Sequence, residues 1–243
     1  ALACAAFTAL TGCGSGVAPP SPAFSGGFER GMLGFNLAGV GEVDPAIVEV
    51  PRGSHRHAAK FTLRGHQGRS ELIVGGDGGE DNGGTKEFGE GAEGWLGFSV
   101  DILRMDYGPP RFFNLIMQFK GEGEGSPNFA MQLADRGGER GIWTSGNAMG
   151  HSRFLAPISS RRWHRVELNF RASNHRAGFY RLFLDGRLID QRHGVSMIPP
   201  GRQRAYIKLG LYRDGLDLDR ISSTLVDSVR IGRLRRDVAV TGR

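Results

Sequence analysis

The segment RAYIKLGLYRD, at 204–214, carries an ammonium group and two phenols in a strictly alternating pattern. Side chains two residues apart in a strand lie on the same face. Tyr206, Lys208 and Tyr212 would therefore share one face, while the apolar residues between them face a core. Gly210, on the polar face, would leave a gap where a ligand can approach the backbone. A phenol can transfer a proton and an ammonium group can neutralise an anion, so we expect a site for an anionic ligand.

Two other segments alternate in a similar way. RFFNLIMQFKG places Asn114, Gln118 and Lys120 on one face and its apolar residues at 113, 115, 117 and 119 on the other. In GRSELIVGG, Arg69 and Glu71 share a face, so the carboxylate can hold the guanidinium in a fixed orientation. These planar donors and cations, together with the phenols, suit an anionic sugar chain.

The elements that must position these residues are short strands. The chain has 243 residues and 39 glycines, and short apolar runs recur between Gly, Asp and Pro turns. This composition predicts an all-β domain of two antiparallel sheets packed face to face. We predict strands at 46–50, 56–63, 69–74, 95–103, 111–119, 127–133, 140–144, 152–156, 162–171, 178–184, 187–191, 204–213 and 223–232. No apolar run is long enough to cross a bilayer.

The charge and the polar, glycine-rich segment at 75–94 say less about function. The net charge of +6 favours an anionic partner, although the high arginine content can equally reflect genome composition. The positive residues are spread along the chain, so we expect no nucleic-acid partner. Separately, we expect the protein to be a monomer. The segment at 75–94 is typical of a functional or mobile loop, and its acidic residues could form a weak Ca²⁺ site. No cofactor is otherwise expected.

The first residues, ALACAAFTALTGCGSG, resemble the end of a bacterial lipoprotein signal peptide, with LTGC as the lipobox. On this interpretation residues 1–12 are removed, Cys13 is lipidated, residues 13–27 form a tether, and residues 28–243 form the folded domain. Lipidation at Cys13 would be the protein's contact with a membrane, in the bacterial cell envelope. An ordinary secretory segment with a chance cysteine is the alternative. Cys4 would be lost, so no disulfide is expected.

Five blocks occur in an order that resembles the jelly-roll polysaccharide lyases: RSEL, MQFKG, RRWHRVELNFRAS, FLDGRLI and YIKLGLYR. The similar groups are the heparin-lyase-I-like proteins, the family-20 glucuronan lyases and the family-7 alginate lyases. The resemblance extends over about residues 50–232 and implies a concanavalin A-like β-jelly roll with a concave substrate groove. The W-H and D-G blocks alone also fit non-catalytic laminin-G or concanavalin-like modules.

The resemblance implies β-elimination on a polymer that contains uronic acid. Arg69 and Gln118 would neutralise the uronate carboxylate, with Lys208 or Lys120 adding charge. Tyr212 would protonate the leaving oxygen and could also remove the C5 proton. Lys208 lies roughly 13 Å from Tyr212 along the strand, so the cation that stabilises a phenolate would come from another strand, with Arg69 the first choice. Tyr206, Asn114 and Glu71 complete the expected substrate-binding set.

One departure from the lyase pattern concerns the base. Where these lyases often have Q-x-H, this chain reads Gln118-Phe119-Lys120. His57, on the strand before RSEL, is the first candidate to replace the missing histidine. The other candidates are His55, His66, His151 and His164. A single tyrosine acting as both base and acid is the other solution, and it favours elimination with both groups on one side.

Two other functions stay open at the level of the sequence. The first is a lipid-anchored, non-catalytic carbohydrate-binding module with the same fold, in which Tyr212 need not meet Arg69 and Gln118. The second is a jelly-roll glycoside hydrolase, which needs two carboxylates about 5–10 Å apart. Glu71 and Glu167 are the strand carboxylates that could form such a pair.

Overall fold

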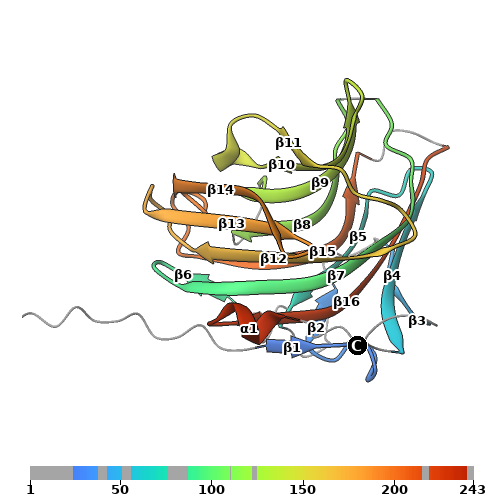
Figure 1. Ribbon diagram of the computed structural model, residues 1–243, viewed down its shortest axis with the longest axis horizontal. Coiled ribbons are helices and arrows are strands. Elements are labelled where there is room, and N and C mark those ends of the chain that lie inside the picture. Colours follow the sequence, from blue (N-terminus) through green and yellow to red (C-terminus); the bar gives the residue numbers. More distant parts are fainter. Residues whose placement is uncertain are drawn as a thin grey trace, which may run out of the picture.

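The computed structural model describes residues 24–37, 43–50, 56–75, 87–109, 111–121, 125–214 and 219–239. Within these residues the chain forms two eight-stranded antiparallel sheets, which appear as two curved layers in Figure 1. The expected all-β sandwich is therefore confirmed. The expected signal peptide, Cys13, most of the tether, and most of the segment at 75–94 lie outside the described residues.

The first sheet has the order β14-β13-β12-β7-β16-β4-β3, with β1 paired to β16. Its strands are β14 (Arg187–Val195), β13 (Gly178–Leu184), β12 (Trp163–Arg171), β7 (Glu93–Met105), β16 (Ile221–Gly232), β4 (His57–Arg64), β3 (Ala46–Glu49) and β1 (Phe24–Gly26). A single turn of helix, α1 (Arg235–Val238), follows β16 and packs against β16 and β7.

The second sheet has the order β11-β10-β9-β8-β15-β5-β2, with β6 paired to β15. Its strands are β11 (Arg153–Ala156), β10 (Glu139–Ser145), β9 (Phe129–Arg136), β8 (Asn114–Gly121), β15 (Arg204–Arg213), β5 (Arg69–Val74), β2 (Phe35–Leu37) and β6 (Glu87–Gly89). A 3₁₀ turn, η1 (Asn147–Met149), precedes β11. The three segments that contain the predicted site residues thus form neighbouring strands, in the order β8, β15 and β5.

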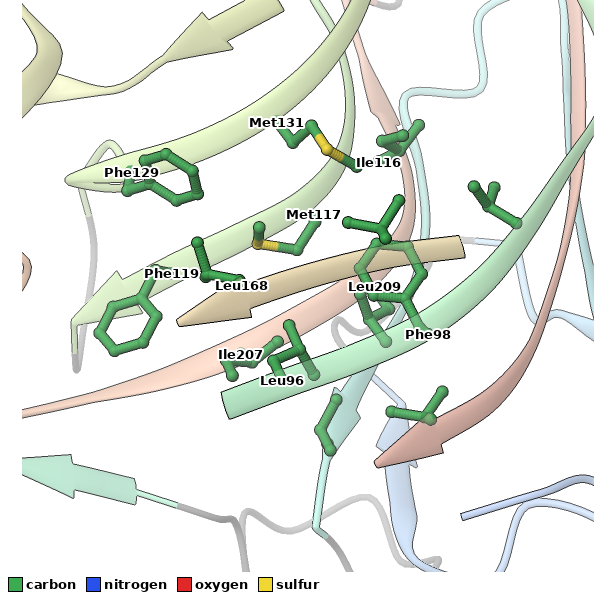
Figure 2. Close-up of a cluster of buried hydrophobic side chains, with 14 of the residues drawn as sticks. Leu96, Phe98, Ile116, Met117, Phe119, Phe129, Met131, Leu168, Ile207 and Leu209 are labelled. Atoms are coloured by element: carbon green, nitrogen blue, oxygen red, sulfur yellow. The ribbon is translucent and has the colours of Figure 1, made fainter. Parts of the chain in front are cut away.

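The core lies between the two sheets and is built from the apolar half of each alternating strand. Figure 2 shows Leu96, Phe98 and Leu168 of the first sheet facing side chains of the second, which include Ile207 and Leu209. These five side chains are at most 1% exposed. Burying a side chain of this size stabilises the fold by about 1.5–3 kcal/mol. The core therefore fixes the facing direction of every strand, and with it the polar side chains on the outer faces.

Every predicted strand is present, and those at 69–74, 178–184 and 204–213 have the predicted bounds. The sequence did not indicate β1, β2 or β6, which have three residues each and are too short to show a period of two. Among the described residues, no helix is long and apolar enough to cross a membrane.

Candidate active site

An open groove of about 780 Å³ lies on the outer face of the second sheet. Its floor comes from β5, β8 and β15, and its other side comes from segments 125–127 and 145–152. The lining residues are Arg69, Phe113, Leu115, Gln118, Lys120, Gly125, Ser126, Pro127, Ser145, Gly146, Asn147, Gly150, Ser152, Tyr206, Lys208 and Tyr212. A groove of this kind can hold part of an extended chain.

Strand β15 has the two faces that its sequence predicts. Tyr206, Lys208 and Tyr212 line the groove, whereas the apolar side chains at 207, 209 and 211 belong to the core. The alternation arises because the core accepts only one half of the strand. The three polar side chains are therefore held at fixed positions along the groove floor.

Gly210 has a different role from the expected gap for a ligand. Its φ is +138°, and a Cβ there would collide with the carbonyl oxygen of Ser70 and lie 2.8 Å from the Cα of Glu71. Gly210 is also absent from the groove lining. The glycine is needed because β15 bends and approaches β5 closely at this point. The expectation of an open gap is corrected.

Arg69 and Tyr212 are directly opposite residues on β5 and β15. The guanidinium carbon of Arg69 lies 4.2 Å from the centroid of the Tyr212 ring. Phe113 meets the same ring edge-to-face, at a centroid distance of 4.9 Å. Tyr212 is thus held between a cation and an aromatic ring, and the cation comes from the neighbouring strand.

Glu71 connects two cations and one amide of the groove floor, those of Arg69, Lys208 and Gln118. Its Oε1 accepts a hydrogen bond from Nε2 of Gln118 at 2.5 Å. Its Oε2 lies 3.2 Å from Nε of Arg69 and 4.0 Å from Nζ of Lys208. The side chain of Glu71 is only 1% exposed. Glu71 was expected to bind substrate; its burial instead places it beneath the groups that line the groove.

Lys208 is buried in the groove floor, opposite Gln118 on β8. Burial lowers the pKa of its ammonium group, Glu71 opposes that shift, and Arg69 and Lys120 reinforce it. Lys120 also lines the groove, opposite Tyr206 in the register. Among the described residues, three cations line the groove: Arg69, Lys120 and Lys208.

Asn114 does not face the groove, although the alternation predicted that it would. The residue is 1% exposed, and its Nδ2 donates to the carbonyl oxygens of Tyr107 and Leu133. Its Oδ1 accepts a hydrogen bond from Nη2 of Arg220 at 2.7 Å. Asn114 therefore holds together the segments at one end of β8, and its expected role in substrate binding is corrected.

The reason is an irregularity in β8. The pairing of β8 with β9 shifts register between Leu115 and Met117. Leu115 and Phe113 line the groove, while Ile116 and Met117 both belong to the core. Such a bulge reverses the inside–outside assignment of every residue before it. Gln118 and Lys120 come after the bulge and face the groove as predicted.

His57 lies on β4 in the first sheet, not in the groove. Its Nδ1 is 2.8 Å from Oε2 of Glu29, and its Nε2 is 3.9 Å from Oε1 of Glu49. The structure does not bring His57 to Tyr212, because the chain passes from one sheet to the other between β4 and β5. Its expected catalytic role is corrected.

No other histidine of the described segments lines the groove either. His164 is buried and contacts Oγ of Ser159 at 2.9 Å and Oδ2 of Asp185 at 2.8 Å, which ties a loop to the β13–β14 turn. His55 lies outside the described residues, and His66 and His151 are absent from the lining.

The carboxylate pair expected for a glycoside hydrolase is not assembled. Glu71 belongs to the second sheet, whereas Glu167 lies on β12 of the first sheet and pairs with Arg235 at 2.8 Å. Within the described segments, no group of three or more His, Cys, Asp or Glu side chains could hold a metal ion.

The sequence did not indicate the far side of the groove, which consists of small residues in loops: Gly125, Ser126, Pro127, Ser145, Gly146, Asn147, Gly150 and Ser152. The one available signal was the density of Gly, Ser, Asn and Pro around 125–127 and 145–152, which predicts turns but not where they lie. Phe113 and Leu115 were assigned to the core.

The model of the polysaccharide lyase family matches residues 38–230, which is most of the chain. The chain belongs to this family. The lyase matches no curated protein sequence. Membership of this family makes the protein a lyase that acts on polysaccharides.

Three solved structures illustrate this similarity. The endo-β-1,4-glucuronan lyase of the fungus Trichoderma reesei is 19% identical, with a TM-score of 0.59 over 80% of this chain and 88% of that one. The alginate lyase Aly36B is 12% identical, with a TM-score of 0.58 over 90% and 99%. The marine family-7 alginate lyase AlyA1 of Zobellia galactanivorans is 14% identical, with a TM-score of 0.51 over 73% and 78%. At these identities the likeness establishes the jelly-roll fold of the lyase.

Proposed function

We propose that the lyase cleaves a uronic-acid-containing anionic polysaccharide by β-elimination in the groove of the second sheet. The observation that carries this proposal is the Arg69–Tyr212 pair, with a guanidinium 4.2 Å from a phenol ring on the groove floor. Gln118 lies on the same floor and is connected to Arg69 through Glu71. A non-catalytic module would need no such arrangement. Glucuronan and alginate, named in the titles of the similar structures, are the first substrates to consider.

In the reaction a base removes the proton from C5 of a uronate, and the C4–O bond breaks. A double bond forms between C4 and C5, and the departing sugar oxygen takes a proton. The C5 proton is weakly acidic because the adjacent carboxylate already carries a negative charge. Arg69, Gln118 and Lys208 would neutralise that carboxylate, and so stabilise the charge that develops on the enolate-like transition state.

Tyr212 is the residue that we assign to proton transfer. As a phenolate it would take the C5 proton, and as the resulting phenol it would give that proton to the leaving oxygen. One residue serving both steps requires that the two groups leave from the same side of the sugar. This assignment needs no histidine, in keeping with the described lining of the groove. Tyr206 and Lys120 would bind a neighbouring sugar.

The test is incubation of the lyase with glucuronan, alginate, heparin, heparan sulfate, hyaluronan and pectate, over several pH values and with and without Ca²⁺. We expect at least one polymer to give the ultraviolet absorbance of an unsaturated uronate. Its absence with all six would contradict the proposal. Binding to a polymer without product would then favour the carbohydrate-binding module.

We also propose that Cys13 carries a lipid that anchors the lyase in a bacterial cell envelope. This rests on the lipobox-like LTGC sequence. Mass spectrometry of the N-terminal peptide after expression in bacteria should find an acylated Cys13, and Cys13→Ala should release the protein from the membrane fraction. An unmodified Cys13 in membrane-free protein would contradict it.

A further inference from the structure

Glu71 occupies a position that substrate binding does not explain. It lies on β5, and its carboxylate contacts groups on three neighbouring strands: Arg69 on β5, Gln118 on β8 and Lys208 on β15. With a side chain only 1% exposed, it is separated from any sugar in the groove by the groups that it contacts. Its effect on a reaction would therefore pass through the residues that it contacts, these three among them.

A buried carboxylate determines how each neighbour is oriented. Gln118 must present its amide nitrogen, not its oxygen, to Glu71, because a carboxylate only accepts hydrogen bonds. The second N–H of the amide and its Oε1 then become the groups that Gln118 can offer to a ligand. Arg69 uses Nε toward Glu71, which leaves the two terminal nitrogens of its guanidinium for an anion. Both side chains are thus oriented before a substrate arrives.

The negative charge of Glu71 also acts on Lys208. The groups around this lysine are Glu71 and Arg69 from β5, Gln118 and Lys120 from β8, and Tyr206 from its own strand. Burial, Arg69 and Lys120 all lower the pKa of Lys208, and Glu71 is the group that raises it. Glu71, 4.0 Å from Nζ of Lys208, is thus the group around this lysine that favours its charged form.

We propose that Glu71 is a positioning residue that holds Arg69, Gln118 and Lys208 as one receptor for the substrate carboxylate and places a compensating negative charge beside Lys208. The inference rests on the proposed function, because the receptor has a role only if a uronate is bound. It assigns to one buried carboxylate both the geometry and the charge of the receptor.

The decisive variants are Glu71→Gln, which keeps the shape and removes the charge, and Glu71→Asp, which keeps the charge and shortens the side chain. We expect Glu71→Gln to lower kcat/KM by about 10²-fold, the usual effect of small misplacement of binding groups. Its activity should also be lost at a lower pH than in the wild type, because Lys208 releases its proton more readily. Glu71→Asp should lower kcat/KM but keep the alkaline limit of the wild type.

Lys208→Arg supplies the control, because a guanidinium stays protonated throughout the accessible pH range. In the double variant Glu71→Gln/Lys208→Arg, the alkaline limit should match that of Lys208→Arg alone. If Glu71→Gln and the wild type have superimposable pH profiles, the inference is overturned. Thermal unfolding of each variant identifies one that fails to fold, and Glu71→Asp then carries the test.

A measurement that needs no activity separates the two proposals. The chain has only four lysines, so selective isotope labelling gives four NMR signals, and Lys208→Arg identifies that of Lys208. Its titration should move to lower pH in Glu71→Gln. An unchanged titration would overturn the inference alone, whereas a wild-type protein that yields no unsaturated product would overturn the proposed function.

Discussion

Replacing Tyr212 by phenylalanine removes one hydroxyl group and should abolish elimination while the fold stays intact. The two ring contacts of Tyr212, with Arg69 at 4.2 Å and Phe113 at 4.9 Å, do not use the hydroxyl. Phenylalanine therefore retains both. A substitution that removes the whole ring, Tyr212→Ala, would lose a cation–π contact and an edge-to-face contact, worth about 1–3 kcal/mol together.

The expected effect on the reaction is much larger than the effect on stability. A positioned acid or base contributes about 10²–10⁴-fold to a rate, and Tyr212 is assigned both roles. We therefore expect Tyr212→Phe to lower kcat by about 10⁴-fold, or about 5.5 kcal/mol of transition-state stabilisation. Binding of the polymer should change little, because the groups that contact the carboxylate are unchanged.

The assay is the initial rate of formation of the unsaturated product, combined with calorimetric binding of the same polymer. Tyr206→Phe is the matched control, since it removes the other phenol of the groove floor; we expect a loss of less than about tenfold, as for one hydrogen bond. If Tyr212→Phe keeps more than a tenth of wild-type kcat, Tyr212 is not the proton-transfer residue.

Three further predictions concern stability and the excluded histidine. Lys208→Met should raise the melting temperature and reduce activity. Because burial lowers the pKa of Lys208, the stability advantage of the variant should be largest at neutral pH and should shrink as the pH rises toward 10.5, the ordinary pKa of lysine. A stability advantage that does not change with pH would contradict this. Gly210→Ala should destabilise the fold by about 1–3 kcal/mol in denaturant titrations, because φ is positive and the carbonyl of Ser70 blocks a Cβ; wild-type stability would refute this explanation. His57→Ala should keep activity within about twofold, the ordinary range for a residue remote from the chemistry. The hydrogen bond from His57 lowers the pKa of Glu29 to about 2, so wild-type stability from this pair should fall as the pH drops from 4.5 toward 2, and the variant should lack that component of the acid transition.

The sequence predicts this fold well because alternation and burial coincide. In 204–213 the apolar residues 205, 207, 209 and 211 occupy every second position, so the period of two fixes both the bounds and the facing direction of the strand. In 178–184 the burial alternates in the same way. The same regularity brought Arg69, Gln118, Lys208 and Tyr212 to one face. Short edge strands such as β6 contain too few residues to show the period, and they escaped detection.

The errors in the site have two physical causes. Asn114 was misplaced because the bulge between Leu115 and Met117 reverses the pattern, and nothing in the local sequence marks it. His57 was misplaced because nearness along the chain was taken for nearness in space, whereas β4 and β5 belong to different sheets. The loop residues opposite the floor depend on contacts between distant segments, which a single sequence does not show.

The bend at Gly210 lies between the two working parts of the groove. Lys208 and Tyr212 are four residues apart on β15, but their partners on β8, Gln118 and Leu115, are only three apart, because both strands change register there. The spacing between the carboxylate receptor and the proton-transfer residue is therefore a property of the backbone rather than of any side chain. A related protein that binds a sugar of different ring shape could change the distance between the carboxylate receptor and Tyr212 by moving the register shift along β15. The reactive residues themselves would stay the same.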